Sequence, residues 1–207
     1  MVPRARHTGG TTASRVGRSA RWLTLLAVAC ASLLAPLRAR AETTVPLDLQ
    51  VELLLKVVRF ERGFARRSEL GVTVLLVTRH GDPASERAAA QLTRGLRDAR
   101  QIAGRPVRII AHLYTSAAAL KSATAGEGAQ LVYLTPGLDA DVADIASAMV
   151  GVPAITVSTD GDQVDRGIIL GFALVSARPK IALNVGQAKR QGLDFNSDLF
   201  RLARVIP

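Results

Sequence analysis

Cysteine is almost absent from this chain, and aromatic residues are scarce. The one cysteine, Cys30, lies inside an apolar run near the N-terminus, and aromatic residues make up 4% of the 207 residues. If processing removes that apolar run, no cysteine remains, which excludes disulfides, thiolate chemistry and cysteine-based metal sites. The low aromatic content also argues against the base-stacking platforms with which proteins hold single-stranded nucleic acid.

Acidic residues are missing from the first 41 positions, which carry seven arginines. The formal net charge of +10 comes mostly from this segment, because the remaining residues hold 20 Lys and Arg against 17 Asp and Glu, a net of +3. A nearly balanced remainder forms no broad basic surface, so we do not expect nucleic acid as a partner.

The first 41 residues have the order of parts that a secretory signal peptide requires. Arginine-rich residues 1–21 precede an apolar run at 22–37, and Ala39-Arg40-Ala41 has the small-x-small form of a signal peptidase site. The run of about 16 residues is shorter than the roughly 20 that cross a bilayer comfortably. We predict cleavage after Ala41 and a periplasmic location for residues 42–207. A retained N-terminal anchor and lipidation at Cys30 are the alternatives.

The hydrophobic pattern after residue 45 alternates between helical and strand spacing. Apolar residues repeat at helical spacing from Pro46 to about Arg67, and Gly71–Thr78 is then a continuous apolar and β-branched run. Such runs are typical of strands buried on both faces of a parallel sheet. The alternation continues with predicted helices at 82–99, 115–125 and 138–149 and predicted strands at 107–113, 130–134 and 153–158. This order indicates βαβ units. Asp82 is the expected N-cap of the first of these helices, and Thr115 or Ser116 that of the second.

The last part of the chain changes this rhythm. Predicted strands at 167–175 and 180–185 are joined by a short turn, which indicates an antiparallel hairpin. A short helix follows up to Gly192, and Asn196 or Ser197 can cap a last helix. Its inward-facing residues would be Leu199, Leu202, Ala203 and Ile206. We therefore expect one α/β domain over 42–207, a three-layer sandwich with a mostly parallel sheet extended by a C-terminal antiparallel hairpin.

The stretch from Gly151 to Pro207 also carries a family resemblance. It contains in order Thr-Val-Ser at 156–158, an acidic loop, Arg-Gly-Ile-Ile at 166–169, a strand ending near Asn184, and Gly-Leu at 192–193. This order resembles the YfiR/HmsC-like family of periplasmic regulatory proteins, over about residues 47–206.

The resemblance implies a small periplasmic α/β domain that represses a membrane-bound diguanylate cyclase by protein contact and so adjusts cyclic-di-GMP. Family members are often dimeric, so a homodimer is an expected state. They also carry disulfide-forming cysteines, which residues 42–207 lack, so redox control is not implied for this chain.

Two charged segments are the candidate surfaces for a partner or a ligand. The basic one consists of four arginines in the first predicted helix: Arg59, Arg62, Arg66 and Arg67. These arginines form either a solvated helix end or a contact for an acidic partner or anionic headgroups. The other follows a predicted strand and consists of Asp160, Asp162, Asp165 and Arg166. It lies where α/β sheets bind ligands, but its carboxylates fall short of a calcium site, so we expect a turn capped by Asp.

Enzyme signatures are not evident in the sequence. His80 and His112 lie near predicted strand ends without a third metal ligand at recognisable spacing. A nucleophile elbow, a phosphate-binding loop and a zinc-protease motif are all missing. We expect a regulator that is not an enzyme and uses no cofactor or metal. The alternatives are a periplasmic small-ligand-binding protein serving a transporter or sensor kinase, with a pocket near His80, Tyr114 and Asp160–Asp165, and a hydrolase using His and Asp residues.

Overall fold

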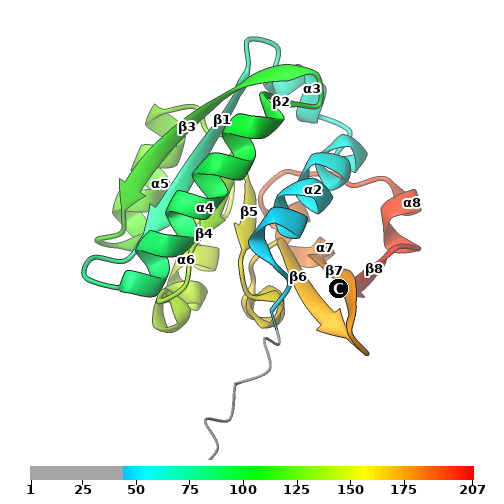
Figure 1. The fold of residues 1–207 in the computed structure, drawn as a ribbon. Coiled ribbons are helices and arrows are strands. Elements are labelled where there is room, and N and C mark those ends of the chain that lie inside the picture. The colour runs from blue at the N-terminus through cyan, green and yellow to red at the C-terminus, as the bar shows by residue number, and fades with distance from the viewer. Residues whose placement is uncertain (1–43) are drawn as a thin grey trace, which may run out of the picture. The chain divides into compact units, whose positions relative to one another are not determined.

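The computed structural model describes residues 44–207, which form a layered α/β fold (Figure 1). The predicted signal peptide and its cleavage site after Ala41 lie outside these residues, so both stay predictions. None of the helices in the described residues combines the length and the apolar character that crossing a membrane requires.

Within residues 44–207, eight strands form one sheet in the order β2-β3-β1-β4-β5-β6-β7-β8. Their bounds are β1 Val72–Thr78, β2 Gln101–Ile102, β3 Arg105–Leu113, β4 Leu131–Leu134, β5 Ile155–Ser158, β6 Leu170–Val175, β7 Arg178–Asn184 and β8 Ala203–Ile206. The neighbouring pairs β3–β1, β1–β4, β4–β5 and β5–β6 are parallel, and β7 is antiparallel to β6. The predicted parallel sheet with its C-terminal hairpin is confirmed.

Helices cover both faces of this sheet, which gives three layers (Figure 1). The helices are α2 Leu47–Val57, α3 Phe64–Arg67, α4 Pro83–Ala99, α5 Ala117–Gly126, α6 Val142–Ala148, α7 Val185–Arg190 and α8 Ser197–Phe200. Three 3₁₀ turns are η1 Val58–Phe60, η2 Asp139–Asp141 and η3 Gly161–Arg166.

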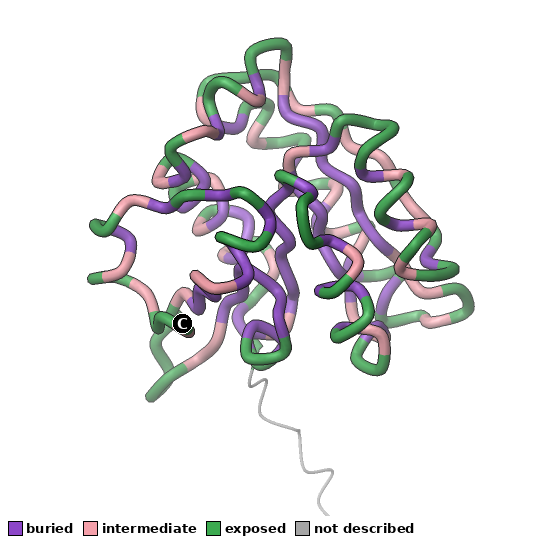
Figure 2. Tube along the Cα trace, turned by 180° about the vertical axis from the view of Figure 1, so that it is seen from behind, coloured by how far each residue is buried: buried purple, intermediate pink, exposed green. Residues whose placement is uncertain are grey.

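Successive residues of β1 point to opposite faces and join separate hydrophobic cores, as the two-residue period of a strand requires. Val74 and Leu76 belong to the core under α2 and α4, whereas Leu75 and Val77 belong to the core under α5 and α6. The buried residues accordingly follow the central strands (Figure 2). The continuous apolar runs in the sequence therefore report strands that are covered on both sides.

Local signals place the starts of two helices as predicted. The Asp82 side chain accepts hydrogen bonds from the backbone N–H groups of Ala84 and Ser85, and Pro83 occupies the first turn of α4. Ser116 caps α5 in the same way by accepting from Ala119.

The first predicted helix is interrupted. α2 ends at Val57, and Glu61 has an extended backbone before α3 begins at Phe64. Glu61 forms an isolated antiparallel bridge with Phe195. The pairing continues because the N–H of Asn196 donates to the carbonyl of Phe60 at 2.8 Å. Strand-like pairing with a distant segment therefore replaces helical hydrogen bonds that the local sequence favours.

The predicted C-terminal helix is wrong. α8 spans only Ser197–Phe200, and Ala203–Ile206 forms β8 beside β7. Leu202, expected to face inward, is 59% exposed. The β-branched Val205 and Ile206 suit a strand, and the edge of β7 offers backbone partners that an isolated helix turn lacks. The short strand β2 was also not predicted.

Candidate functional site

The two candidate surfaces lie at opposite ends of the parallel strands. The arginine stretch precedes β1 and therefore lies toward the amino ends, whereas Asp160–Arg166 directly follows β5 at the carboxyl ends. The structure therefore shows two separate surfaces and not one site.

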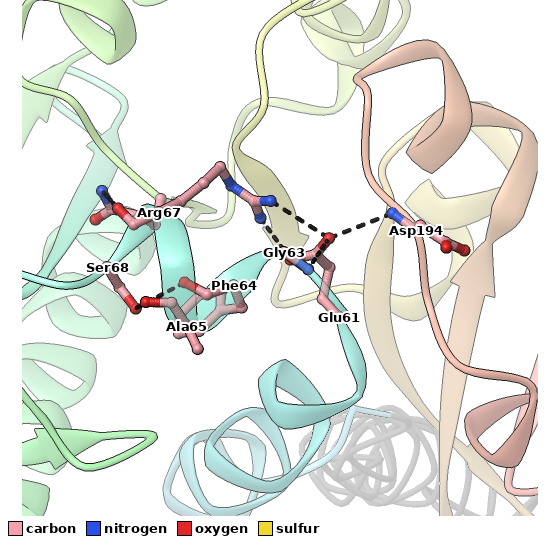
Figure 3. A network of polar contacts seen from close by, with 8 residues as sticks. Glu61, Gly63, Phe64, Ala65, Arg67, Ser68 and Asp194 are labelled. Atoms are coloured by element: carbon pink, nitrogen blue, oxygen red, sulfur yellow. Dashed lines mark hydrogen bonds and ion pairs between the residues drawn. The ribbon is translucent and has the colours of Figure 1, made fainter.

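A buried carboxylate organises the amino-end surface (Figure 3). Glu61 is 4% exposed, and its Oε2 accepts from Arg67 Nη2 at 2.6 Å. Its Oε1 accepts from the backbone N–H groups of Gly63 at 3.1 Å and Asp194 at 3.3 Å. A buried charge is tolerated only when it is paired in this manner. Arg67 is thus part of the internal structure rather than a free surface cation.

The other three arginines of this surface have exposed side chains. Arg62 pairs with Asp194 at 3.0 Å in an ion pair that is open to solvent, and Arg59 and Arg66 are exposed. Exposed ion pairs contribute little stability. The side chains of Arg59, Arg62 and Arg66 are therefore open to solvent, and their contact with a partner stays a prediction.

A shallow cavity of about 550 Å³ lies beside these arginines. Its lining includes Arg66, Arg67, Arg108 and the fully exposed Leu70. Arg108 is engaged, because its guanidinium contacts Glu127 at 3.0 Å. The amino end thus presents exposed arginines, the exposed Glu69 and one fully exposed leucine.

The acidic segment at the carboxyl end is a short 3₁₀ helix. Asp160 caps η3 by accepting from the N–H of Asp162 at 2.9 Å, as predicted. Asp165 binds Arg204 of β8 through both carboxylate oxygens at 2.9 and 3.1 Å, which raises the pKa of that guanidinium. Arg166 donates to the backbone carbonyl of Asp139. Among residues 44–207, no cluster of His, Cys, Asp or Glu is arranged to hold a metal ion.

A second cavity, of about 490 Å³, lies at this carboxyl end. It is bounded by the start of α2, by α4, and by the loops that follow β4 and β5. Its lining residues are Thr44, Val45, Pro46, Leu47, Gln50, Ala88, Gln91, Pro136, Asp139, Thr159, Asp160 and Gln163. The loop after β4 borders the point where the strand order reverses between β1 and β4, and α/β sheets bind ligands at this position.

Buried neutral side chains fix the wall formed by α2. Gln50 is fully buried, and its Nε2 donates to the carbonyls of Val45 at 2.8 Å and Thr159 at 3.1 Å. Its Oε1 accepts from the Tyr133 hydroxyl at 2.7 Å. Burial raises the pKa of Tyr133, so this hydroxyl stays protonated and keeps donating.

A second chain of hydrogen bonds fixes the opposite wall. The Ser158 hydroxyl donates to Gln163 Oε1 at 2.8 Å, and Gln163 Nε2 donates to Asp139 Oδ1 at 2.8 Å. The loops after β4 and β5 are therefore tied to each other through one amide side chain. Buried hydrogen-bond networks of this kind hold their side chains in place.

The residues that the sequence suggested for a pocket are only partly at this cavity. Asp160 lines it, but His80 and Tyr114 are not among its lining residues. Tyr114 lies under the guanidinium of Arg79, 5.3 Å from ring centre to Cζ, and burial and Asp141 raise its pKa. His112 is half-buried, and burial lowers its pKa.

The sequence did not single out Gln50, Tyr133 or Gln163. The one local signal was a glutamine among the apolar residues of the first helix, at a position that the helical period turns inward. A buried amide in that place requires partners, but their identity depends on the fold.

Comparisons with known proteins identify one family. A model of the YfiR/HmsC-like family matches residues 48–204. No curated protein matches the chain significantly. The family match covers most of the chain and nearly all of the residues that the structure describes.

Solved structures share the fold at low sequence identity. A conserved domain protein from Vibrio cholerae has a TM-score of 0.54 at 12% identity and covers 77% of this chain. The ABC domain in complex with L-Trp from Streptococcus pneumonia has a TM-score of 0.52 at 12% identity and covers 78% of this chain. A ligand-free, open substrate-binding protein from Clostridium difficile has a TM-score of 0.52 at 13% identity and also covers 78% of this chain. This chain spans 60%, 62% and 60% of the lengths of these three proteins, respectively. At such low identity, the similarity shows a common fold and nothing more.

Proposed function

The chain belongs to the YfiR/HmsC-like family, and from this premise we propose that it is an exported periplasmic regulator that acts by binding rather than by catalysis. Its target is a membrane-bound signalling protein, a diguanylate cyclase by family resemblance. The observation that carries the proposal is the family match over residues 48–204.

The amino-end surface is the contact that we assign to this partner. Arg66 and the exposed Leu70 line the same cavity, and Arg59 and Arg62 add exposed positive charge on the stretch that precedes Arg66. Exposed cations steer association with an acidic partner and set the salt dependence of its on-rate. An exposed leucine adjoining them supplies an apolar contact. An acidic periplasmic region of a membrane protein fits this surface.

Capture of membrane proteins tests the proposal. The full chain is expressed with a C-terminal tag, and proteins retained from solubilised membranes are identified by mass spectrometry. We expect a membrane protein with a cytoplasmic cyclase domain, and we expect deletion of the gene to raise cellular cyclic-di-GMP. Retention of no such protein above an empty-tag control, together with unchanged cyclic-di-GMP, would contradict the regulator.

A matched pair of triple variants tests the surface. Arg59→Glu, Arg62→Glu and Arg66→Glu together should abolish capture, because they reverse the charge of the proposed contact. The control combines Arg87→Glu, Arg94→Glu and Arg97→Glu, which are exposed positions of α4 with the same change in net charge. Equal loss of capture in both triples would point to net charge rather than to this surface.

A second candidate function is a small-ligand-binding protein that serves a transporter or a sensor kinase. The cavity at the carboxyl ends favours it, because its walls are fixed by buried hydrogen bonds. One protein of similar fold was solved in complex with L-Trp, and another is a substrate-binding protein. A thermal shift with L-tryptophan or a metabolite panel would support this candidate, since a ligand of the native state raises its stability.

A further inference from the structure

The charges at the carboxyl-end cavity are of one sign. Its lining contains the carboxylates Asp139 and Asp160, and within the described part of the chain no lysine or arginine lines it. The rest of the lining is neutral, with apolar side chains from Val45 to Leu47, at Ala88 and at Pro136. A cavity with this lining is suited to a ligand with positive charge and an aliphatic portion.

The three glutamines of the lining differ in the capacity they have left for a ligand. Gln50 uses both amide hydrogens and its oxygen inside the protein. Gln163 accepts from Ser158 and donates one amide hydrogen to Asp139, and Gln91 makes one exposed contact to Asp48. Gln50 is therefore structural, whereas the amides of Gln163 and Gln91 can add hydrogen bonds to a ligand whose charge is met by the carboxylates.

The two carboxylates retain acceptor capacity and are held in place. Asp139 uses Oδ1 to accept from Gln163, and Asp160 uses Oδ1 to accept from the N–H of Asp162. A carboxylate has about four lone-pair sites, so each of them can accept further hydrogen bonds. Both carboxylates are oriented by these bonds without being neutralised by a cation that lines the cavity.

Neighbouring cations are directed elsewhere. Arg166 donates to the backbone carbonyl of Asp139, and Arg79 pairs with Asp141, but neither guanidinium lines the cavity. The partial positive charge at the start of α2 is balanced by Asp48 in its first turn. The local field in the cavity is therefore set by Asp139 and Asp160.

We propose that this cavity binds a small organic cation, with an ammonium group held by Asp139 and Asp160 and an aliphatic part against Val45 and Pro46. The volume of about 490 Å³ lies in the range of small-molecule sites. The inference rests on the second candidate function, ligand binding, and does not require the diguanylate cyclase. An ammonium donates three hydrogen bonds, which match the open positions of the two carboxylates.

Calorimetry and thermal shift with probes of equal length test the inference. Protein expressed from the full chain is titrated with 1,4-diaminobutane, 1,4-butanediol and succinate. We expect the diamine alone to bind and to raise the unfolding temperature, with weaker binding as salt is added. The proposal would be overturned if the diamine did not bind at millimolar concentration, or if the diol bound equally well.

Isosteric variants locate the site. Asp139→Asn and Asp160→Asn keep the oxygen that accepts from Gln163 and from Asp162, so both variants should fold. Each should weaken diamine binding about tenfold or more, because a charge-assisted hydrogen bond is lost. Asp162→Asn is the matched control, since this exposed residue of the same turn does not line the cavity.

The outcomes separate the two proposed functions. Unchanged affinity in both Asn variants would overturn the assigned site even if the diamine binds. Loss of diamine binding with normal capture of the membrane partner would leave the regulator intact and reject only the ligand. Diamine binding without partner capture would reject the regulator and retain the ligand.

Discussion

The two ends of the parallel strands are built from different polar chemistry. At the carboxyl end, the buried polar side chains are neutral: Tyr133 donates to Gln50, and Gln163 accepts from Ser158 and donates to Asp139. At the amino end, the buried Glu61 is paired with Arg67 and the remaining arginines are exposed. A neutral network avoids the desolvation of charge that an ion pair must offset.

The two ends therefore differ in what their buried polar groups do: at the carboxyl end they line a cavity, and at the amino end they connect two distant segments of the chain. The hydrogen bonds of Gln50 and Gln163 fix the walls of the carboxyl-end cavity, whose carboxylates Asp139 and Asp160 can still accept further hydrogen bonds. At the amino end, the buried charge is engaged in fastening α3 to the segment at Asp194. Two predictions test this contrast, beginning with the larger expected effect, and a third concerns a half-buried histidine outside both networks.

Gln50→Ala should be the most destabilising change. It removes the side chain that bonds the carbonyls of Val45 and Thr159 and the hydroxyl of Tyr133, leaves these three groups without that partner, and opens a cavity. We expect a loss of about 3 kcal/mol in the free energy of unfolding, measured by urea denaturation. Gln91→Ala is the control, because its one bond to Asp48 is exposed and 3.4 Å long. Equal effects of the two variants would show that the buried network is not what stabilises this end.

Glu61→Ala should have the next largest effect. It removes a buried carboxylate that binds Arg67 and two backbone N–H groups. We expect a loss of about 2 kcal/mol, less than for a fully enclosed pair because Arg67 can turn toward solvent. Arg62→Ala, which breaks the exposed pair with Asp194, should change stability by less than about 0.5 kcal/mol. If Arg62→Ala lost more unfolding free energy than Glu61→Ala, the exposed ion pair rather than the buried carboxylate would hold the two segments together.

His112→Gln should produce the smallest effect, visible only in the pH dependence of stability. Burial lowers the pKa of His112 in the folded protein, so below about pH 6.5 the unfolded chain takes up a proton more readily. Stability therefore falls as the pH drops from about 6.5 toward the folded-state pKa, and the variant should lack this contribution. Urea denaturation at pH 7.5 and pH 5.5 measures it, with His80→Gln on an exposed turn as the matched histidine removal. An unchanged pH slope in His112→Gln would refute the prediction.

Local sequence signals predicted the parts of the fold that depend on neighbours in the chain. The caps at Asp82 and Ser116 and the apolar run at Val72–Thr78 needed no tertiary information. The prediction for the last segment was wrong because the spacing of Leu199, Leu202 and Ile206 suits a helix. In the structure, the residues of β8 pair with the edge strand β7 instead. Local periodicity cannot report whether an edge is available.

The candidate site shows the same division. The strand-end rule placed Asp160 at the carboxyl end, and the structure puts it on the cavity wall. Gln50 and Tyr133 are 83 residues apart in sequence, and Gln163 and Asp139 are 24 apart. Amide side chains have no spacing that announces such pairs, so only the fold brings them together.

The carboxylate of Glu61 also has a consequence for hydrogen exchange. It protects the amides of Gly63 and Asp194, and Glu61 and Asp194 are 133 residues apart in sequence. When this contact opens, both amides lose their acceptor in the same event. The turn before α3 and the segment at 194–196 should therefore exchange as one cooperative unit, and they should become protected late in folding, after the long loop between them has closed.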